Sequence, residues 1–386
     1  MNCRAMSMTL CLWLSAALAA QQPATLRIGT WNLEQLGIRG DPPRTDADHQ
    51  AIADYIEKLD VAVLAVQEVG SDQALDDLCR RLGPTFRNVL GTSGSFSDGK
   101  GRVSVGFVFD TAKVELLHAA ELLQLPTQAE GLPIFHRIPV TACFRARGGG
   151  LDFRAVTVHI KAGQKPDDFQ KRRLEVSALR DWLAALLRSP GEDQDVVVLG
   201  DFNHSYETEA ATLFQQDGVV RYLKSNKAND PTIAHFDAPI DMFAISRGFD
   251  EVVDGSYDAH NEDGLRDKAT WQRVYTDHFP LTLAITADRD RDPQATFTQE
   301  PPERRLPAEA RPGRRDAAPA PTPAPTSALE VDTLTTGSRV LVITAEARVS
   351  GTLLRPLGAW IWVRDEQGLV RAFPVEAVRE VRQGQR

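Results

Sequence analysis

Carboxylate and amide side chains stand where three apolar stretches of this chain end. Asn32 and Glu68 each follow one such stretch, and the fragment Gly200-Asp201-Phe202-Asn203 follows a third. A fourth fragment, Thr276-Asp277-His278, begins a further apolar stretch. Oxygen ligands of this kind suit a hard cation such as Mg²⁺, and in open α/β sheets ligands bind at the edge where strands end. The spacing therefore predicts a site for a metal ion and a phosphate group at one sheet edge.

Two histidines accompany these groups. His278 stands next to Asp277, and imidazole is the side chain that most readily exchanges a proton near neutral pH. His159 ends another strand-like stretch, two residues before Lys161. Taken singly, each fragment is explained as well by a solvated turn residue, a helix cap or a buried histidine. Four such fragments in this order are harder to explain by turn chemistry, so we interpret them as one site.

Together with Asp241 in the fragment Pro239-Ile240-Asp241-Met242, the set resembles the endonuclease/exonuclease/phosphatase superfamily, the deoxyribonuclease-like metal phosphoesterases. The resemblance covers about residues 25–287 and implies hydrolysis of phosphoric esters with Mg²⁺ or Mn²⁺ as the cofactor. It also implies a four-layer α/β sandwich, in which two stacked mixed β-sheets are flanked by helices. Strand and helix patterns are mixed along this part of the chain, as such a fold requires.

The resemblance assigns roles at the metal side of the site. Glu68 matches the main metal ligand, and Asn32 and Asp277 match further ligands. Asp201 matches the residue that orients or deprotonates the attacking water. Asn203 matches a catalytic residue that donates a hydrogen bond to a phosphate oxygen.

The same resemblance assigns roles around the phosphate. His278 matches the group that exchanges a proton, and Asp241 matches the aspartate that holds this histidine in the productive tautomer. His159 matches a residue that binds the scissile phosphate and stabilises the transition state. Arg137 aligns with a phosphate-contacting arginine of the secreted deoxyribonucleases, with a structural salt bridge as the equal alternative. Lys161 is a second candidate cation for the phosphate.

The chain departs from the pancreatic-type deoxyribonucleases at positions where those enzymes contact duplex DNA. Gly70 stands where those enzymes carry an arginine, and the strand that begins at Arg102 lacks their tyrosine and second glutamate. We therefore expect a nuclease acting on DNA or RNA with a preference for single strands or small phosphodiesters. The alternative keeps the chemistry but takes a phosphomonoester, sphingomyelin or another phospholipid head group. A non-catalytic binding protein is disfavoured, because the site residues are all intact.

The N-terminus has the layout of a secretory signal peptide over residues 1–20. Arg4 precedes the apolar run from Met8 to Leu18, and small residues follow. This run is too short to span a membrane, so we expect export to the periplasm or the extracellular space without stable membrane insertion. After cleavage, Cys79 and Cys143 remain, either as one disulfide or as two buried thiols.

A net charge of −9 argues against a protein that coats nucleic acid through bulk positive charge. It does not exclude a nuclease, because a bound divalent metal reverses the local sign of an acidic site. We expect the chain to act on nucleic acid as a monomer.

Periodicity predicts the elements that position these residues. Phe169 belongs to the predicted apolar face of a long helix that Asp167 opens, and Arg172 and Glu175 are predicted to form ion pairs on its surface. Two further helices are expected at residues 52–59 and 72–82. Strands are expected at residues 26–31, 61–66, 102–109, 113–118, 134–145, 151–161, 196–201, 240–246, 251–254 and 279–286.

The composition changes at Asp288. Residues 288–328 are rich in Pro, Ala, Arg and Glu with few large apolar side chains, which predicts a disordered linker. Residues 329–386 contain five short strand patterns separated by glycines, and they resemble the SH3-like small β-barrels. Barrels of this kind commonly bind a peptide, a glycan or nucleic acid, and we see no catalytic residues in this part.

Overall fold

The computed structural model describes residues 25–39, 42–95, 101–225, 227, 230–291, 296–298 and 306, and the backbone of five strands between Arg339 and Gln383. The contacts between Cα atoms divide the chain into two units, Met1–Gly313 and Arg314–Arg386. The predicted signal peptide and most of the predicted linker lie outside the described residues. Within the described part, no helix is both long and apolar enough to cross a membrane.

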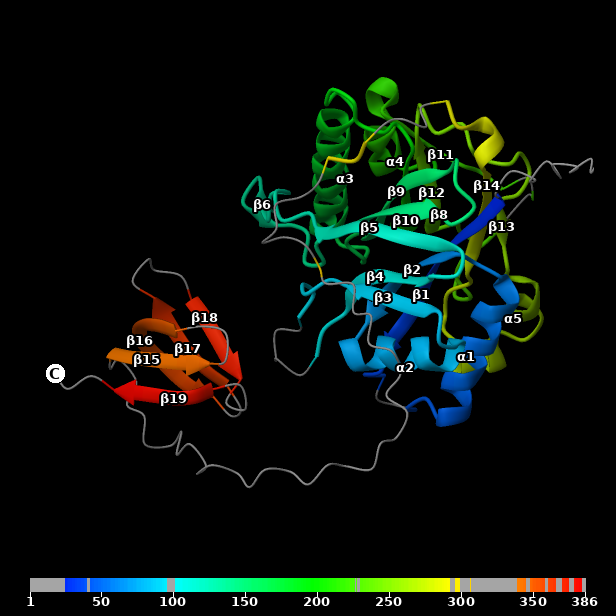
Figure 1. Cartoon of the computed structure of the whole chain (residues 1–386). Helices are drawn as coiled ribbons and strands as arrows, with labels where there is room; N and C mark the ends of the chain where they lie inside the picture. Colours follow the sequence, from blue (N-terminus) through cyan, green and yellow to red (C-terminus); the bar gives the residue numbers. More distant parts are fainter. Residues whose placement is uncertain are drawn as a thin grey trace, which may run out of the picture. The chain divides into compact units, whose positions relative to one another are not determined.

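Two six-stranded mixed sheets form the first unit (Figure 1). The first sheet has β1 and β2 parallel and its other neighbours antiparallel. Its spatial order is β13 (Asp258–Ala259), β14 (Leu281–Thr286), β1 (Thr25–Leu36), β2 (Val63–Val69), β4 (Ser104–Asp110) and β3 (Phe86–Leu90).

The second sheet has β9 and β10 parallel and its other neighbours antiparallel. Its spatial order is β11 (Val220–Tyr222), β12 (Asp241–Ser246), β10 (Val196–Asp201), β9 (Asp152–His159), β8 (Val140–Ala146) and β5 (Val114–Glu121). A separate hairpin consists of β6 (Gln128–Ala129) and β7 (Leu132–Pro133).

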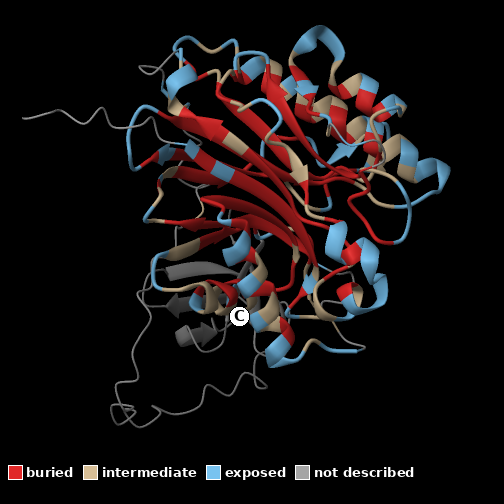
Figure 2. Cartoon of the chain, turned by 90° about the vertical axis from the view of Figure 1, so that its right-hand side faces the viewer, coloured by how far each residue is buried: buried red, intermediate tan, exposed pale blue. Residues whose placement is uncertain are grey.

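Helices cover the outer faces of both sheets, and the strands between them are the most buried part of the unit (Figure 2). One apolar cluster lies between the sheets and includes Phe107, Phe144 and Phe153. The other clusters join each sheet to its helices. These layers form the four-layer α/β sandwich that the resemblance implied. The first sheet carries α1 (Asp46–Leu59), α2 (Asp72–Leu82) and α6 (Lys268–Val274), with α5 (Glu262–Arg266) next to α6, and the second carries α3 (Pro166–Leu186) and α4 (Glu209–Phe214).

Local sequence explains where the first two helices begin. The Ser71 hydroxyl accepts a hydrogen bond from the backbone N–H of Ala74, and α2 has the bounds that its periodicity predicted. At α1, Thr45 and Asp48 form a reciprocal capping box. This cap starts α1 at Asp46, earlier than its apolar spacing indicated.

Two predicted strands are wrong in extent. The strand expected at residues 134–145 begins only at Val140, because Phe135 within that range has a φ of 51°, which is incompatible with a strand. Residues 251–254 form only an isolated bridge, between Val252 and Ile285. The short strands β3, β11 and β13 and the helices α4, α5 and α6 had no clear periodic signal.

The predicted faces of α3 are also partly wrong. Phe169, placed on the apolar face, is 47% exposed. Arg172 and Glu175, placed on the surface, are both buried. The Glu175 carboxylate accepts hydrogen bonds from the backbone N–H groups of Phe135 and Lys161, so it holds two loops and is not an ordinary surface charge.

The two cysteines that remain after the predicted cleavage are buried free thiols, so the disulfide alternative is wrong. Burial raises the pKa of Cys79 to about 12 and that of Cys143 to about 12. Both thiols are therefore poor nucleophiles at neutral pH.

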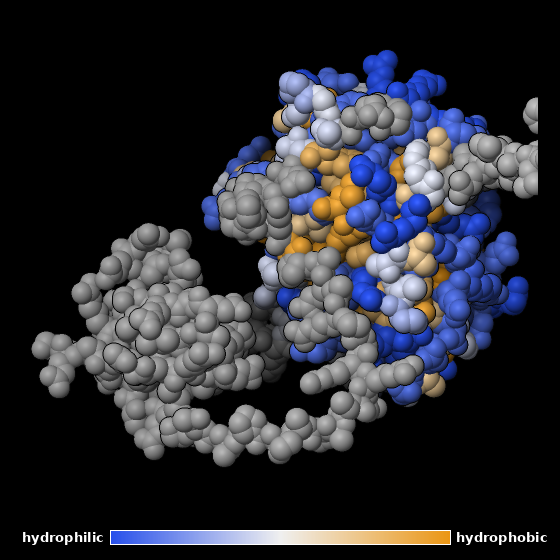
Figure 3. Space-filling view, in the orientation of Figure 1, coloured by the Kyte–Doolittle hydropathy of each residue, from blue (hydrophilic) through white to orange (hydrophobic). Residues whose placement is uncertain are grey.

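After β14 the chain returns to the edge strand β5. The backbone N–H of Leu306 donates to the carbonyl of Ala119, and the Leu306 side chain packs against the cluster between the sheets. In Figure 3, hydrophobic side chains gather on the face of this unit around β5 and β8, with hydrophilic side chains around them.

The second unit contains one antiparallel five-stranded sheet. Among the described strands, the pairing begins at β18 and ends at β19, so closure into an SH3-like barrel stays a prediction. The spatial order is β18 (Val370–Pro374), β17 (Trp360–Asp365), β16 (Arg348–Leu357), β15 (Arg339–Thr344) and β19 (Val378–Gln383).

Candidate active site

Strand register brings the predicted site residues to one edge of the sandwich. In the second sheet, Asp201 at the end of β10 is the partner of His159 on β9 and of Asp241 on β12. In the first sheet, Asn32 on β1 is the partner of Gln67 on β2. Parallel strands end on the same side, which places these polar groups together.

A β-bulge turns Glu68 into the site. The register of β2 against both neighbours shifts beyond Val66, and Glu68 has a φ of 57°. Behind it, the buried Gln67 amide donates to Thr30 on the first sheet and to Thr157 on the second. Gln67 therefore connects the two sheets by hydrogen bonds next to the site.

Asn32 links the two acidic groups of the site. Its Nδ2 atom lies 3.3 Å from Oε1 of Glu68 and 3.1 Å from Oδ2 of Asp201. Its Oδ1 atom accepts from the backbone N–H of Glu34. The side chain of Glu68 remains 21% exposed, so its carboxylate is open to a solvent-borne ligand.

His278 and Asp241 form a buried pair. Nδ1 of His278 lies 2.8 Å from Oδ2 of Asp241, and Nε2 lies 3.9 Å from Oδ2 of Asp201. The backbone carbonyl of His278 accepts hydrogen bonds from the indole N–H groups of Trp31 and Trp271, which fix the position of the residue. Burial by itself lowers the pKa of His278, but the nearby carboxylates outweigh it and raise that pKa well above its usual value.

Asp201 and His159 face each other in the same buried space. Nε2 of His159 lies 3.4 Å from Oδ2 of Asp201 and 3.8 Å from Oε1 of Glu68. Burial, and then Asp241, raise the pKa of Asp201 to about 7. Burial, and then Arg137, lower the pKa of His159 well below its usual value, so its ring is neutral.

Asn203 follows a turn that requires glycine at position 200. Gly200 has a φ of 144°, and a Cβ atom there would lie 2.1 Å from the carbonyl oxygen of Val158. The Asn203 backbone N–H donates to Oδ1 of Asp201, and its Nδ2 atom donates to the carbonyl of Ile160. One amide hydrogen of Asn203 therefore remains for a ligand.

The two predicted phosphate-binding cations have partners within the protein. Arg137 is buried and donates to the backbone carbonyls of His159 and Ile160. Lys161 pairs with Asp168 of α3 at 3.0 Å. Arg137 thus braces the end of β9 within electrostatic reach of Glu175, Glu68 and Asp201, and its contact with a phosphate stays a prediction.

Asp277 faces His278 and a charged cluster that sequence reasoning missed. Oδ1 of Asp277 lies 3.9 Å from Nε2 of His278, and its backbone N–H donates to Glu34. Glu34 also pairs with Arg39 and Arg44. Its position two residues after Asn32, at the same strand end, was a signal that could have found it.

The oxygen-rich side of the site fits a divalent cation. Among the described residues, one group of acidic and imidazole side chains within 4.8 Å of one another at this edge is Asp201, Asp241 and His278. Asp241 and His278 hydrogen-bond each other through Oδ2 and Nδ1, which engages one potential ligand atom of each residue. Glu68, Asn32 and Asp277 also carry hard oxygen atoms, and their role as metal ligands stays a prediction.

A hollow of about 440 Å³ adjoins the site. Two aromatic rings at its rim, Phe169 and Phe236, are each 47% exposed. Asn203 and Arg172 line it as well, and the Arg172 guanidinium lies 4.7 Å from the centre of the Phe169 ring. The hollow therefore offers aromatic faces and hydrogen-bond donors directly beside Asn203.

A four-layer sandwich with carboxylates, an asparagine and an Asp–His pair at one strand edge defines the class of metal-dependent phosphoric ester hydrolases. The family described as Endonuclease/Exonuclease/phosphatase matches residues 29–307, and the chain belongs to this family.

Individual relatives agree with the family. The chain is 32% identical over 189 residues to a protein named "Deoxyribonuclease" from Thioalkalivibrio sp. (strain K90mix), covering 47% of this chain and 46% of that one. It is 22% identical over 292 residues to "Endonuclease/exonuclease/phosphatase family domain-containing protein 1" of Xenopus laevis, covering 69% and 50%. The chain thus spans about half the length of these curated relatives.

A solved structure shows the same fold. The endonuclease/exonuclease/phosphatase from Bacteroides vulgatus is 16% identical and superposes with a TM-score of 0.51, over 68% of this chain and 98% of that one. The likeness supports the sandwich architecture alone.

Proposed function

We propose that the mature chain is an exported, divalent-metal-dependent phosphodiesterase, specifically a nuclease that cleaves DNA or RNA by in-line attack of water. The observation that carries the proposal is the contact chain from Glu68 through Asn32 to Asp201, with the His278–Asp241 pair on the other side of Asp201. This arrangement supplies a cation site and a proton-transfer group within one polar space.

A Mg²⁺ or Mn²⁺ ion held by Glu68, Asn32 and Asp277 would supply charge neutralisation for the phosphate. Asp201 would orient the attacking water, because its carboxylate is fixed by the backbone N–H of Asn203 and by the Asn32 amide. Asp241 holds His278 with Nε2 toward Asp201. His159 and the remaining amide hydrogen of Asn203 would donate to the phosphate oxygens.

The surroundings of the site favour flexible strands over duplex DNA. A Cβ atom at Gly70 would lie 2.5 Å from Cγ2 of Ile38, so this position has no room for a gripping arginine. Phe169 and Phe236 beside the hollow can stack on unpaired bases, which every base permits. The relative named "Deoxyribonuclease" supports a nucleic acid substrate.

A substrate panel tests this proposal. Metal-stripped mature protein is mixed with Mg²⁺ or Mn²⁺ and offered single-stranded DNA, duplex DNA, RNA, sphingomyelin and a set of phosphomonoesters. We expect hydrolysis of single-stranded nucleic acid that chelator abolishes. Preferred hydrolysis of sphingomyelin or a phosphomonoester would replace the nuclease proposal, and absence of all hydrolysis would favour a binding protein.

A variant pair connects the activity to the proposed metal site. Glu68→Ala should lose activity at metal concentrations that saturate the parent, because the main carboxylate ligand is gone. Glu115→Ala, on the exposed side of β5, is the matched control and should keep parental activity. Full activity of Glu68→Ala in excess chelator would overturn the metal assignment.

Export is part of the same proposal and rests on residues 1–20. We propose that the chain is delivered to the periplasm or the extracellular space and cleaved near Ala19 or Ala20. N-terminal sequencing of the protein from fractionated cells checks this. Recovery of uncleaved chain from the cytoplasmic fraction would contradict it.

A further inference from the structure

Arg172 on α3 carries a positive charge that the protein leaves without an ion partner. The residue is only 3% exposed. Its Nη1 atom donates to the backbone carbonyls of Lys161 and Gly163, each at 2.8 Å. Its Nε and Nη2 atoms have no hydrogen-bond partner among the residues that the structure describes, and neither atom is sealed off from solvent. Half of the donor capacity of this buried guanidinium is therefore unused.

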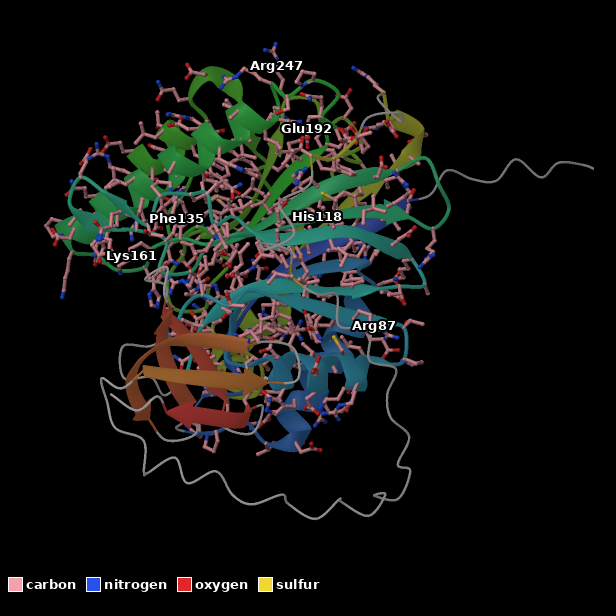
Figure 4. All side chains as sticks on the ribbon, turned by 60° about the vertical axis from the view of Figure 1, so that its left-hand side comes forward. Arg87, His118, Phe135, Lys161, Glu192 and Arg247 are labelled. Carbon is pink, nitrogen blue, oxygen red and sulfur yellow. The ribbon has the colours of Figure 1, made fainter. Side chains whose placement is uncertain are left out.

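The carboxylates on α3 that act on Arg172 through space have other partners. Asp168 pairs with Lys161 at 3.0 Å. Glu175 accepts from the backbone N–H groups of Phe135 and Lys161, and Figure 4 shows these two residues close together at one end of the unit, beside α3. Within the described part of the chain, no carboxylate forms an ion pair with Arg172. Because a buried charge without a partner is unfavourable, the open N–H groups favour an anionic ligand.

The hollow of about 440 Å³ beside Asn203 is the space that this ligand would enter, since Arg172 lines it. The Phe169 ring lies 4.7 Å from the Arg172 guanidinium carbon and covers one face of the group, so its N–H edge is what a ligand can reach. Asn203 donates to the carbonyl of Ile160, and Arg172 donates to that of Lys161, the next residue. Both donors therefore hold the segment that follows β9, and both line the same hollow.

The rest of the hollow carries no unpaired charge. Arg173 and Glu209 also line it, and they pair with each other at 3.1 Å. Burial lowers the pKa of His204 to about 4, so its ring is neutral at pH 7. Among the described residues that line the hollow, Arg172 is thus the charged group without an ion partner. The hollow has a net positive charge and suits an anion.

We propose that Arg172 binds a second phosphate of the substrate, the one that flanks the scissile phosphate in a nucleic acid strand. This inference rests on the proposed nuclease function and adds a residue that determines its substrate. Nε–H and one Nη2–H lie on the same edge of the planar guanidinium, a fork that matches two oxygens of a phosphate. Asn203 would then face the scissile phosphate, with the nucleoside between the two phosphates lying against Phe169 and Phe236.

Binding of small nucleotides to the metal-free protein tests the second phosphate without any hydrolysis. The full mature chain is kept in chelator and titrated by calorimetry with thymidine 3′,5′-bisphosphate, thymidine 3′-monophosphate and thymidine 5′-monophosphate. We expect the bisphosphate to bind at least about 10-fold more tightly than either monophosphate, because a charge-assisted bidentate contact is added to the same nucleoside.

Arg172→Met tests the residue itself. This variant should lose the preference for the bisphosphate and bind the monophosphates as the parent does. Arg180→Met is the matched control, because Arg180 is also on α3 and donates to the carbonyl of Leu213, but does not line the hollow. It should keep the preference. An equal loss for all three nucleotides in Arg172→Met would mean that Arg172 only braces the carbonyls of Lys161 and Gly163, and would overturn the proposal.

Arg172→Lys keeps the test decisive if Arg172→Met does not fold. Lysine retains the positive charge and can donate to a carbonyl, but it lacks the planar fork. The preference for the bisphosphate should therefore fall in Arg172→Lys, with folding checked by circular dichroism. An unchanged preference in this variant would contradict the assignment of the phosphate to Arg172.

A sugar series separates this inference from the nuclease proposal. Glucose 1,6-bisphosphate and glucose 6-phosphate are titrated in the same way. An Arg172-dependent preference for the sugar bisphosphate alone would keep the second-phosphate site and replace the nuclease proposal. A preference for thymidine 3′,5′-bisphosphate without hydrolysis of any nucleic acid would also leave the site intact. Equal binding of mono- and bisphosphates in both series would overturn the site, even for a parent chain that cleaves single strands.

Discussion

The Nδ1 atom of His278 lies 2.8 Å from Oδ2 of Asp241, and both side chains are buried. The two residues are 37 positions apart in the chain, on the segment before β14 and on β12 of the other sheet. The contact therefore spans the two sheets. It fixes one imidazole nitrogen and leaves the other directed at the space between Asp201 and Asp277.

This contact predicts the effect of Asp241→Asn. The amide lacks the negative charge that stabilises a protonated His278 and can also turn its NH₂ group toward Nδ1, so we expect kcat to fall by about 10²- to 10⁴-fold, the usual contribution of one acid–base group. Steady-state kinetics at saturating metal measures it, with folding checked by circular dichroism. His260→Gln, at a histidine bonded to Thr282 outside the site, is the control. If Asp241→Asn folds and keeps the parental kcat, the Asp241–His278 pair has a structural role and no role in catalysis.

A second prediction concerns pH and stability. Burial lowers the pKa of His204 from 6.5 to about 4. As the pH falls below 6.5, the unfolded chain binds this proton before the folded chain does. The free energy of unfolding should therefore decrease between pH 6.5 and pH 4, by up to about 3 kcal/mol.

Urea unfolding of the parent and of His204→Gln at several pH values measures that contribution. The variant should be less sensitive to pH in this window, and the two curves should run parallel above pH 7. Parallel curves throughout would show that His204 is protonated in the folded state or exposed to water.

A third prediction concerns the aromatic rim of the hollow. Phe236→Ala and Phe169→Ala should each raise KM for a single-stranded oligonucleotide by about 5- to 100-fold, because one base loses its stacking partner. Hydrolysis of bis(p-nitrophenyl) phosphate, which is too small to reach both rings, should change little. Leu265→Ala removes a comparably exposed apolar side chain on α5 and serves as the control. Equal losses on both substrates would mean that the rings shape the active site itself.

A fourth prediction concerns the chain between the two units. Residues 307–328 contain few large apolar side chains, and dilute protease should cut there first. Cleavage is not expected before Leu306, since that residue is bonded to β5. Mass spectrometry identifies the cleavage site. The N-terminal fragment should keep its activity on small phosphodiesters, which steady-state kinetics measures. Its inactivity would show that the second unit completes the active site.

The sequence by itself determined most of the longer elements and the strand-end residues of the site. Gly200 before Asp201, the cap at Ser71 and the apolar runs of the inner strands are local signals, and local backbone preferences act on neighbouring residues. Glu68, Asp201 and His278 were therefore placed at strand ends before any contact between them was known. The family resemblance then supplied their roles.

Only the tertiary structure decided how side chains far apart in sequence share their partners. Glu175 is buried because it receives N–H groups from two loops, and Lys161 is turned away because Asp168 attracts it. Burial and charge at a residue are set by whatever packs against it, and for these residues the neighbours come from other segments of the chain.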